Sequence, residues 1–267
     1  LQAVVAISPS ALTVYFFCKG IKKLVKYLWN LTPSSARKMQ NEYIHSALDH
    51  DFKEYLGEES QRQYIETQFL STPPHEFDEP NKATTATTRE PMDKFCDRIF
   101  KDNNPNERVY MVLAGSGMGK TTFMVNVFCH YVKQNMTRKG MNLDIRLLRL
   151  DDEKVLDDIK KISEDESIKP EKTILLLDAL DENRYASENF VEFKRKLEDV
   201  MEPFGLVMIT CRDQFFDNEK SIPTSTSWVS VTKDKNLISY NKIYISPFSD
   251  DDIKKYLALK YKNKKRR

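Results

Sequence analysis

A loop with three glycines constrains this chain more than any other feature. The chain holds only seven glycines among 267 residues, and three of them, Gly115, Gly117 and Gly119, lie within five positions. An ordinary protein devotes roughly 7% of its residues to glycine. The cluster follows the apolar run 109–113 and precedes an amphipathic run. We therefore expect a strand, a tight turn and a helix in that order.

Composition excludes several classes of protein. The chain is 40% hydrophobic and 31% charged, with 11 prolines beside the seven glycines, so it is neither collagen-like nor of low complexity. Its length suits one ordinary domain with an extension. The four cysteines, Cys18, Cys96, Cys129 and Cys211, lack the spacing of a zinc site or a disulfide framework, which favours a reducing compartment.

The net charge of +2 conceals a segregation of charge along the chain. Residues 1–31 carry +4 and residues 254–267 carry +8, so the residues between them carry −10. Phosphate backbones attract cationic surfaces, and an acidic body is therefore a poor general nucleic-acid binder. We predict no specific nucleic-acid partner, and we interpret the basic C-terminal residues as a solvated tail.

Residues 1–31 have the features of an anchor. The first 18 residues are uncharged and the lysines from Lys19 to Lys26 follow, which is near the lower limit for a membrane span with the rest of the chain in the cytoplasm. Over 21–28, apolar residues also recur every three or four positions, as on one face of a helix, and the lysines fall on the other face. Two interpretations stay open: residues 1–28 span or lie along the inner or plasma membrane, or they form an ordinary packed helix.

The rest of the chain divides into three parts. Residues 32–88 are expected to form a helical extension, with polar helix over 33–68 and a linker over 71–88 that holds three prolines and five threonines. Residues 89–250 are expected to form the main domain, and residues 251–267 either the start of a helical module or a basic tail. In the main domain, apolar strands are predicted at 108–114, 143–149, 173–178, 205–211 and 242–246, and helices at 91–100, 119–136, 152–163 and 187–202. This alternation predicts an α/β fold in three layers, a parallel sheet between helices.

The residues at 114–121, Ala-Gly-Ser-Gly-Met-Gly-Lys-Thr, are typical of a phosphate-binding loop. Glycines allow successive backbone N–H groups to face the phosphates, and the helix N-terminus adds its dipole. Lys120 is expected to contact the β- and γ-phosphates and the Thr121 hydroxyl to bind Mg²⁺. The first position is alanine where glycine is usual, which is tolerated because it belongs to the strand end. The expected nucleotide-binding residues are Ala114, Gly115, Ser116, Gly117, Met118, Gly119, Lys120, Thr121 and Thr122.

Two further strands end in polar side chains that suit the same site. Strand 173–178 ends in Asp178, a second expected Mg²⁺ ligand, and small Ala179 leaves room beside the phosphates. Asp181 and Glu182 follow and are expected to polarise the attacking water as general base. Strand 205–211 leads into Arg212, at the edge that faces the nucleotide, where a cation contacts the γ-phosphate.

Together these segments resemble the NACHT family of STAND P-loop NTPases. The resemblance rests on residues 114–121, 175–182 and 210–212, and residues 244–253 are similar to the strand-to-helix exit toward the family's helical module. It covers about residues 90–260 and implies a five-stranded sheet in the order 5-1-4-3-2. It also implies ATP or ADP with Mg²⁺ as cofactors, slow ATP hydrolysis as a switch, homo-oligomers on activation, and a role in innate immune or anti-phage defence. The trigger is unknown.

Other functions remain as alternatives. A small-molecule kinase uses the same loop but needs an arginine-rich lid, and residues 143–172 offer Arg146 and Arg149 followed by acids. A non-catalytic scaffold in which ATP only orders the fold is a second alternative. A GTPase is disfavoured, because Asn241-Lys242 is not followed by the aspartate of the guanine-binding motif.

Overall fold

The computed structural model describes residues 33–57, 63–71, 90–101, 107–135, 144–152, 154–216, 230–231 and 237–262. The expected anchor at 1–31 and nearly all of the expected linker at 71–88 lie outside these residues. Among the described helices, none has the length and apolar character needed to cross a bilayer.

A seven-stranded sheet forms the centre of the molecule, with the strand order β2-β1-β9-β3-β6-β5-β4. Five of its strands run parallel: β3 (Val109–Ala114), β4 (Asp144–Arg149), β5 (Thr173–Asp178), β6 (Leu206–Arg212) and β9 (Tyr240–Ile245). Two short antiparallel strands, β1 (Gln68–Leu70) and β2 (Glu90–Pro91), extend the sheet beyond β9.

The prediction of a purely parallel, five-stranded sheet is wrong for the sheet as a whole. The five predicted strands are present within about two residues of the expected bounds, and numbered along the chain they follow the order 5-1-4-3-2. The full order differs because β1 and β2 add an antiparallel edge and make the sheet mixed. These strands hold three and two residues, which is too short for a periodic pattern to reveal them.

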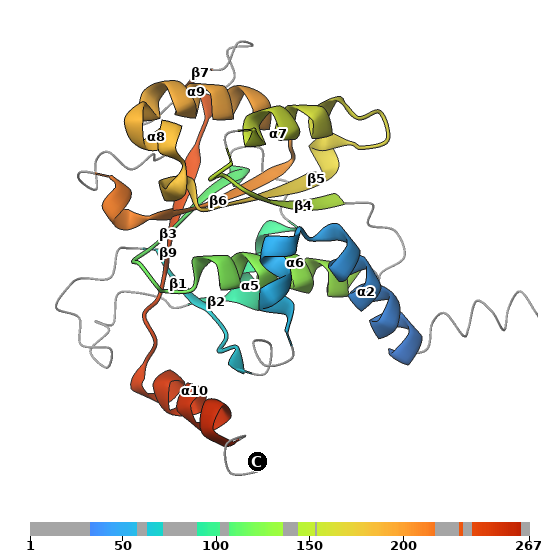
Figure 1. Cartoon of the computed structure of the whole chain (residues 1–267), viewed down its shortest axis with the longest axis vertical. Coiled ribbons are helices and arrows are strands. Elements are labelled where there is room, and N and C mark those ends of the chain that lie inside the picture. Colours follow the sequence, from blue (N-terminus) through green and yellow to red (C-terminus); the bar gives the residue numbers. More distant parts are fainter. Residues whose placement is uncertain are drawn as a thin grey trace, which may run out of the picture.

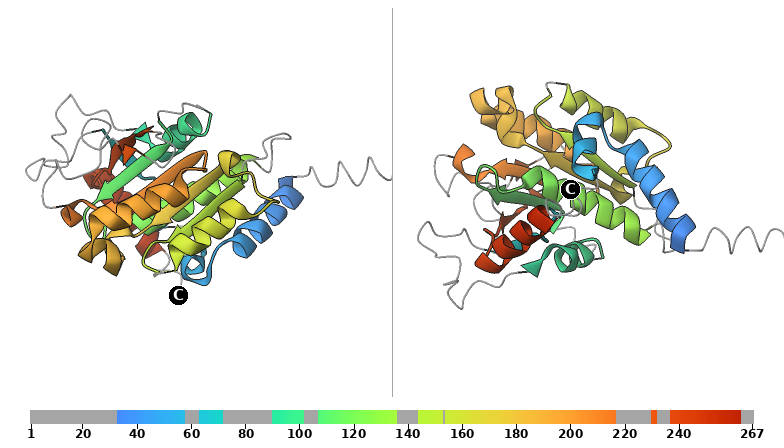
Figure 2. Two further views of the ribbon diagram at one scale, coloured as in Figure 1. Left: turned by 90° about the horizontal axis from the view of Figure 1, so that it is seen from above. Right: turned by 60° about the horizontal axis from the view of Figure 1, so that its bottom comes forward.

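Two hydrophobic cores flank the sheet and give the three predicted layers (Figures 1 and 2). Along β3, Tyr110 and Val112 face one core, whereas Met111 and Leu113 face the other, because successive strand side chains point to opposite faces. The first core contains α5 (Met92–Ile99) and α6 (Lys120–Asn135). The second contains α7 (Val155–Glu164), α8 (Arg184–Glu188) and α9 (Phe190–Met201).

The N-terminal extension is less helical than predicted. Its described residues form α2 (Pro33–Ala47), α3 (His50–Lys53) and the short 3-10 helix η1 (Glu54–Leu56), and residues 64–67 have no regular secondary structure before β1 begins. Within the described residues, the helix predicted over 33–68 is interrupted at 48–49 and at 57 and is wrong at 64–68, and residues 58–62 lie outside the described residues. The extension packs on the main domain: Phe52 is fully buried in the core around α6, and Gln40 Nε2 donates a hydrogen bond to the Lys133 carbonyl at 3.0 Å.

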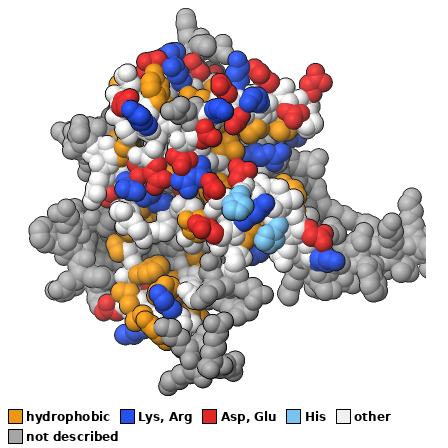
Figure 3. Space-filling model, viewed as in Figure 1, with side chains coloured by type: hydrophobic (Ala, Val, Ile, Leu, Met, Phe, Trp, Pro, Cys, Tyr) orange, Lys and Arg blue, Asp and Glu red, His pale blue; other side chains and the backbone are white. Residues whose placement is uncertain are grey.

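The chain leaves the sheet after β9 and enters α10 (Asp250–Lys262), which projects away from the three layers (Figure 1). Before β9, β7 (Ser230–Val231) and β8 (Leu237–Ile238) form a separate two-stranded sheet. Several large apolar side chains on and before α10 are exposed: Phe248, Ile253, Leu257, Leu259 and Tyr261. Hydrophobic side chains accordingly gather over this helix at the bottom of the view in Figure 3.

Candidate nucleotide site

The glycine loop has the backbone geometry that phosphate binding requires. Gly117 and Gly119 have positive φ angles of 73° and 83°, and α6 begins at the next residue, Lys120. A Cβ atom at Gly117 would have no neighbour within 4 Å, so the loop faces open space there. The backbone N–H groups of the loop and of the first turn of α6 are therefore able to surround an anion.

Two side chains fold back onto the loop. The Gly115 N–H donates to Sδ of Met118 at 3.2 Å, and Lys120 Nζ lies 3.5 Å from the Gly115 carbonyl oxygen. Ala114 is buried at the end of β3, whereas Ser116 is exposed. Both contacts are weak hydrogen bonds. The Gly115 N–H and Lys120 Nζ can therefore exchange them at little cost for stronger hydrogen bonds to charged phosphate oxygens.

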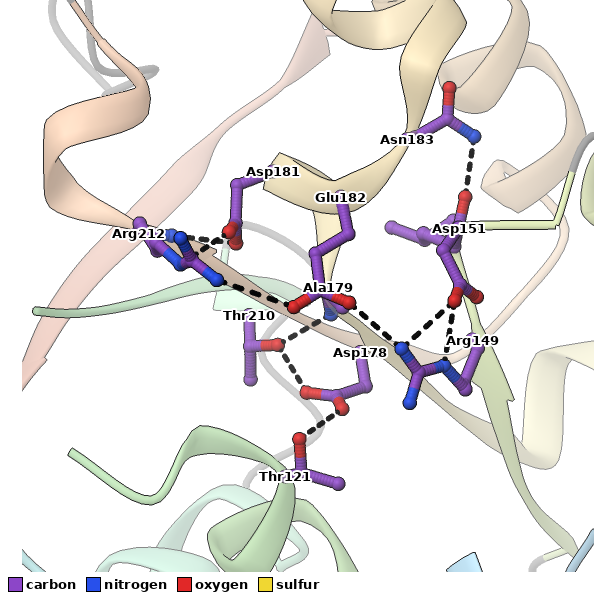
Figure 4. Close-up of polar contacts among 11 residues, drawn as sticks. Thr121, Arg149, Asp151, Asp178, Ala179, Asp181, Glu182, Asn183, Thr210 and Arg212 are labelled. Atoms are coloured by element: carbon purple, nitrogen blue, oxygen red, sulfur yellow. Dashed lines mark hydrogen bonds and ion pairs between the residues drawn. The ribbon is translucent and has the colours of Figure 1, made fainter. Parts of the chain in front are cut away.

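Asp178 links the loop to the neighbouring strands (Figure 4). Its carboxylate is fully buried and accepts a hydrogen bond from Thr121 Oγ1 at 2.7 Å on Oδ2 and from Thr210 Oγ1 at 2.5 Å on Oδ1. The three residues come from the start of α6, the end of β5 and the end of β6. Parallel strands bring these ends to one edge of the sheet, as the sequence predicted for Thr121 and Asp178.

Ala179 turns the chain sharply after the carboxylate. It is the one non-glycine residue with positive φ, at 65°, among those that the structure describes. Its N–H donates to Thr210 Oγ1 at 2.9 Å, and its side chain is buried. A left-handed conformation costs an alanine about 1–2 kcal/mol. The turn places the following 3-10 helix η4 (Leu180–Glu182) across the edge of the sheet, beside the end of β6.

Arg212 is held by the two acids of η4. Its backbone N–H donates to Asp181 Oδ1 at 2.9 Å, and its Nε lies 2.8 Å from Asp181 Oδ2 in an ion pair that is not aligned as a hydrogen bond. Its Nη2 lies 3.4 Å from Glu182 Oε1. The Asp181 side chain is only 5% exposed, and both of its oxygens contact Arg212, whereas the Glu182 side chain is 43% exposed. Asp181 therefore braces Arg212, and Glu182 is the more accessible carboxylate.

Arg149 is a residue of this edge that the sequence did not assign to the site. It ends β4, pairs with Asp178 in the strand register, and donates from Nη2 to Glu182 Oε2 at 2.8 Å. The same Nη2 also lies 2.8 Å from Asp151 Oδ2. The signal was present, because Arg149 occupies the last position of a predicted strand at the functional edge. The kinase alternative gives Arg149 a place in a lid, whereas the structure places it at the edge that carries Asp178 and Glu182.

A cavity of about 560 Å³ adjoins the loop at Gly117, Met118 and Gly119. Its walls come from three parts of the molecule: the extension, the loop with the start of α6, and the segment after β9. The lining residues include Tyr55, Tyr64, Met118, Thr122, Pro247 and Phe248. A volume of this size, with aromatic and apolar walls, is typical of small-molecule sites. The pKa of Tyr55 is raised by burial, then by its neighbour Glu54 and by the charge of Asp178, which places η1 close to the site.

The donor set suits a magnesium nucleotide. Among the described residues, no group of three or more His, Cys, Asp or Glu side chains is placed to hold a metal ion by itself. Mg²⁺ in nucleotide sites is commonly held by one or two protein oxygens together with phosphate oxygens and water. The adjacent oxygens of Thr121 and Asp178 provide such a pair.

Around the site, charges of both signs intermingle. Figure 3 shows acidic and basic side chains side by side over the upper part of one face. The Arg149, Glu182, Arg212 and Asp181 contacts are a local example of this arrangement.

Comparisons with known proteins add little. No protein-family model matches the chain, and no curated protein matches its sequence. One solved structure that aligns with it is that of C. elegans PCH-2, at 13% identity and a TM-score of 0.29. The alignment covers 57% of this chain and 39% of that chain, so this chain matches well under half of it. A likeness this weak does not bear on function, and NACHT membership stays a proposal.

Proposed function

We propose that this chain binds ATP with Mg²⁺, hydrolyses it slowly and uses the bound nucleotide to switch its conformation and self-association. One observation carries the proposal. The buried carboxylate of Asp178 contacts Thr121, the last residue of the phosphate loop, and Thr210 of β6 at the same sheet edge. A carboxylate beside the hydroxyl of such a loop is the arrangement used to bind a magnesium nucleotide.

The residues have separate roles in this proposal. The loop amides and Lys120 bind the phosphates, and Thr121 and Asp178 hold the metal ion, which when bound neutralises charge on the phosphate oxygens. Glu182 polarises the attacking water, because it is the more exposed of the two acids. Asp181 positions Arg212, which exchanges its contact with Glu182 for one with the γ-phosphate.

The cavity beside the loop suits the nucleoside. It continues from Gly117, Gly119 and Thr122 toward aromatic side chains of the extension and of the segment after β9. A base inserted there would contact apolar walls while its phosphates enter the loop. Nucleotide binding would thus involve the extension as well as the main domain.

The biological setting follows from the resemblance alone. A NACHT-type switch that forms homo-oligomers when ATP is bound, and acts in innate immune or anti-phage defence, is the proposal that the motif residues support. The membrane contact of residues 1–28 and the cytoplasmic location of the main domain remain predictions, as do the trigger and the absence of a specific nucleic-acid partner.

The test compares ATP binding, phosphate release and oligomer mass in two variants. Lys120→Ala is expected to weaken ATP binding and to lower turnover about 100-fold, as loss of one phosphate-contacting cation does. Glu182→Gln is expected to keep ATP binding and to lower turnover by roughly 10²- to 10⁴-fold. Lys133→Ala at the far end of α6 and Glu188→Gln on α8 are the matched controls, and both should behave as wild type.

Each alternative predicts a different result. A wild-type chain that binds no ATP would contradict the proposal outright. ATP binding with no change in turnover or assembly in either variant would indicate a scaffold. Phosphate transfer that requires an added small acceptor would indicate a kinase.

A further inference from the structure

Glu182 lies between two arginines that come from different strands. Its Oε2 accepts a hydrogen bond from Arg149 Nη2 at 2.8 Å, and its Oε1 lies 3.4 Å from Arg212 Nη2 (Figure 4). Arg149 ends β4, and Arg212 ends β6, with β5 between them. The carboxylate therefore has a short contact on one side and a longer one on the other.

The backbone around Arg149 is tied firmly to the segment that carries Glu182. The Leu150 N–H donates to the Asp178 carbonyl at 2.8 Å, and Asn183 Nδ2 donates to the Leu150 carbonyl at 2.5 Å. Asn183 is buried, and its Oδ1 also accepts from the Ala186 N–H at 2.8 Å at the start of α8. The end of β4 and residues 178–183 are thus one connected unit, so Arg149 and Glu182 keep their relative position.

The side chain of Arg149 is fixed from a second direction. Its Nε donates to Asp151 Oδ2 at 3.0 Å. This hydrogen bond, with the charges of Asp151, Glu182 and Asp178, raises the pKa of Arg149, which stays cationic. Arg149 is 27% exposed and Glu182 43% exposed, and exposed ion pairs contribute only about 0–1 kcal/mol to folding. The ion pair between Arg149 and Glu182 therefore contributes little to the free energy of folding, and its main effect is to fix the position of Glu182.

The two arginines differ in what a nucleotide would do to them. Arg212 is the proposed γ-phosphate contact, so ATP draws it away from Glu182, whereas Arg149 remains tied to Asp151 and Glu182. From this geometry, and on the basis of the proposed function, we propose that Arg149 is a positioning residue. It holds Glu182 at the catalytic edge and shares its charge, so that Arg212 is free to bind the γ-phosphate.

The proposal predicts two effects of Arg149→Ala. Turnover falls about 10- to 100-fold with little change in KM, the size of effect seen when a supporting hydrogen-bond partner is lost. The preference for ATP over ADP in equilibrium binding also falls several-fold. Without Arg149, Arg212 is the single cationic partner of Glu182 among these contacts, so Glu182 competes better with the γ-phosphate for Arg212. Arg149→Lys recovers part of both effects, since a lysine keeps the charge but not the fork of donors.

A double-mutant cycle separates positioning from a general structural role. In the Glu182→Gln background, Arg149→Ala is expected to change neither kcat nor the ATP/ADP preference, because Arg149 acts through Glu182. Arg146→Ala on the opposite face of the same strand is the control, and thermal unfolding without nucleotide checks folding.

The outcomes are distinguishable from failure of the proposed function. A wild-type chain without Lys120-dependent ATP turnover removes the proposed function, and this proposal with it. If wild-type turnover is normal, three results overturn the positioning role alone. These are additive effects in the cycle, no effect of Arg149→Ala, and faster turnover in Arg149→Ala. Faster turnover would mean that Arg149 holds Glu182 away from the reaction.

Discussion

At the scale of single residues, Thr210 organises the site without touching the loop. Its Oγ1 donates to Asp178 Oδ1 and accepts from the Ala179 N–H, and all three residues are buried. One hydroxyl thus orients the proposed metal ligand and stabilises the left-handed turn that follows it. A buried group that loses its partner pays its full desolvation penalty, which makes this hydroxyl hard to replace.

We predict that Thr210→Val impairs both stability and function. Leaving Asp178 Oδ1 and the Ala179 N–H without this partner should lower the free energy of unfolding by about 1–3 kcal/mol. Turnover should fall about 10- to 100-fold, as for other groups that orient a ligand. Urea unfolding and phosphate release measure the two effects.

Thr173→Val is the matched control for this prediction. Thr173 is equally buried at the start of β5, and its Oγ1 donates to the Lys169 carbonyl at 2.9 Å, far from the functional edge. It should lose stability and keep turnover measured below the melting temperature. Equal loss of turnover in both variants would contradict the orienting role of Thr210.

At the scale of elements, a close backbone contact sets where β6 begins. The Gly205 N–H donates to the Pro170 carbonyl at 3.0 Å, in the 3-10 turn η3 (Pro170–Lys172) that leads into β5. A Cβ atom at Gly205 would lie 2.4 Å from the Glu171 carbonyl oxygen. The junction of the adjacent strands β5 and β6 therefore depends on the absence of a side chain at Gly205.

Gly205→Ala should therefore destabilise the fold. The backbone of η3 must move, and overpacking of this kind costs about 1–3 kcal/mol. Urea unfolding measures the change. Val191→Ala, at a side chain that is 77% exposed on α9, should change stability little. A Gly205→Ala variant as stable as wild type would show that the fold does not depend on close packing of residue 205 against the backbone of η3.

At the scale of the whole molecule, the cavity joins three parts that are distant in the sequence. Tyr55 and Tyr64 belong to the extension, Met118 to the loop, and Phe248 to the segment between β9 and α10. A ligand in the cavity would therefore connect the extension and α10 to the main domain. This is the structural basis on which a nucleotide could change how these parts are arranged.

We predict that Mg²⁺ and ATP together raise the melting temperature. At a nucleotide concentration 100 times the Kd, binding adds about 2.7 kcal/mol. For a chain of this size that is roughly 5–10 °C. Chelating Mg²⁺ should remove most of the shift, because Asp178 would then face the phosphates without a cation between them. Differential scanning fluorimetry measures it.

Phe248→Ala tests the cavity in the same assay. Phe248 is 44% exposed, so its removal should change the unliganded melting temperature little but reduce the shift caused by Mg²⁺ and ATP. Tyr261→Ala, exposed at the end of α10 and outside the cavity lining, is the control. An unchanged shift in Phe248→Ala would place the nucleoside elsewhere.

Much of the fold and part of the site were predictable from the sequence. The glycine loop, the five parallel strands and the meeting of Thr121 with Asp178 depend on local signals: residues that permit positive φ, continuous apolar runs, and acids at strand ends. The ion pair between Asp181 and Arg212 needed the turn at Ala179, which no sequence pattern indicated. β1 and β2 were not predicted, because strands of three and two residues are too short to show an alternation of apolar and polar residues.

The sequence by itself determined which residues can surround a phosphate and which strand ends can face it, since backbone torsion preferences and hydrophobic periodicity are properties of neighbouring residues. The tertiary structure alone decided that Arg149 contacts Glu182, that Asp181 braces Arg212, and that Tyr55 and Phe248 line one cavity. These contacts join residues 30 or more positions apart. They depend on the order of strands in the sheet and on how the extension packs, which follow from burial of the whole chain and not from any one segment.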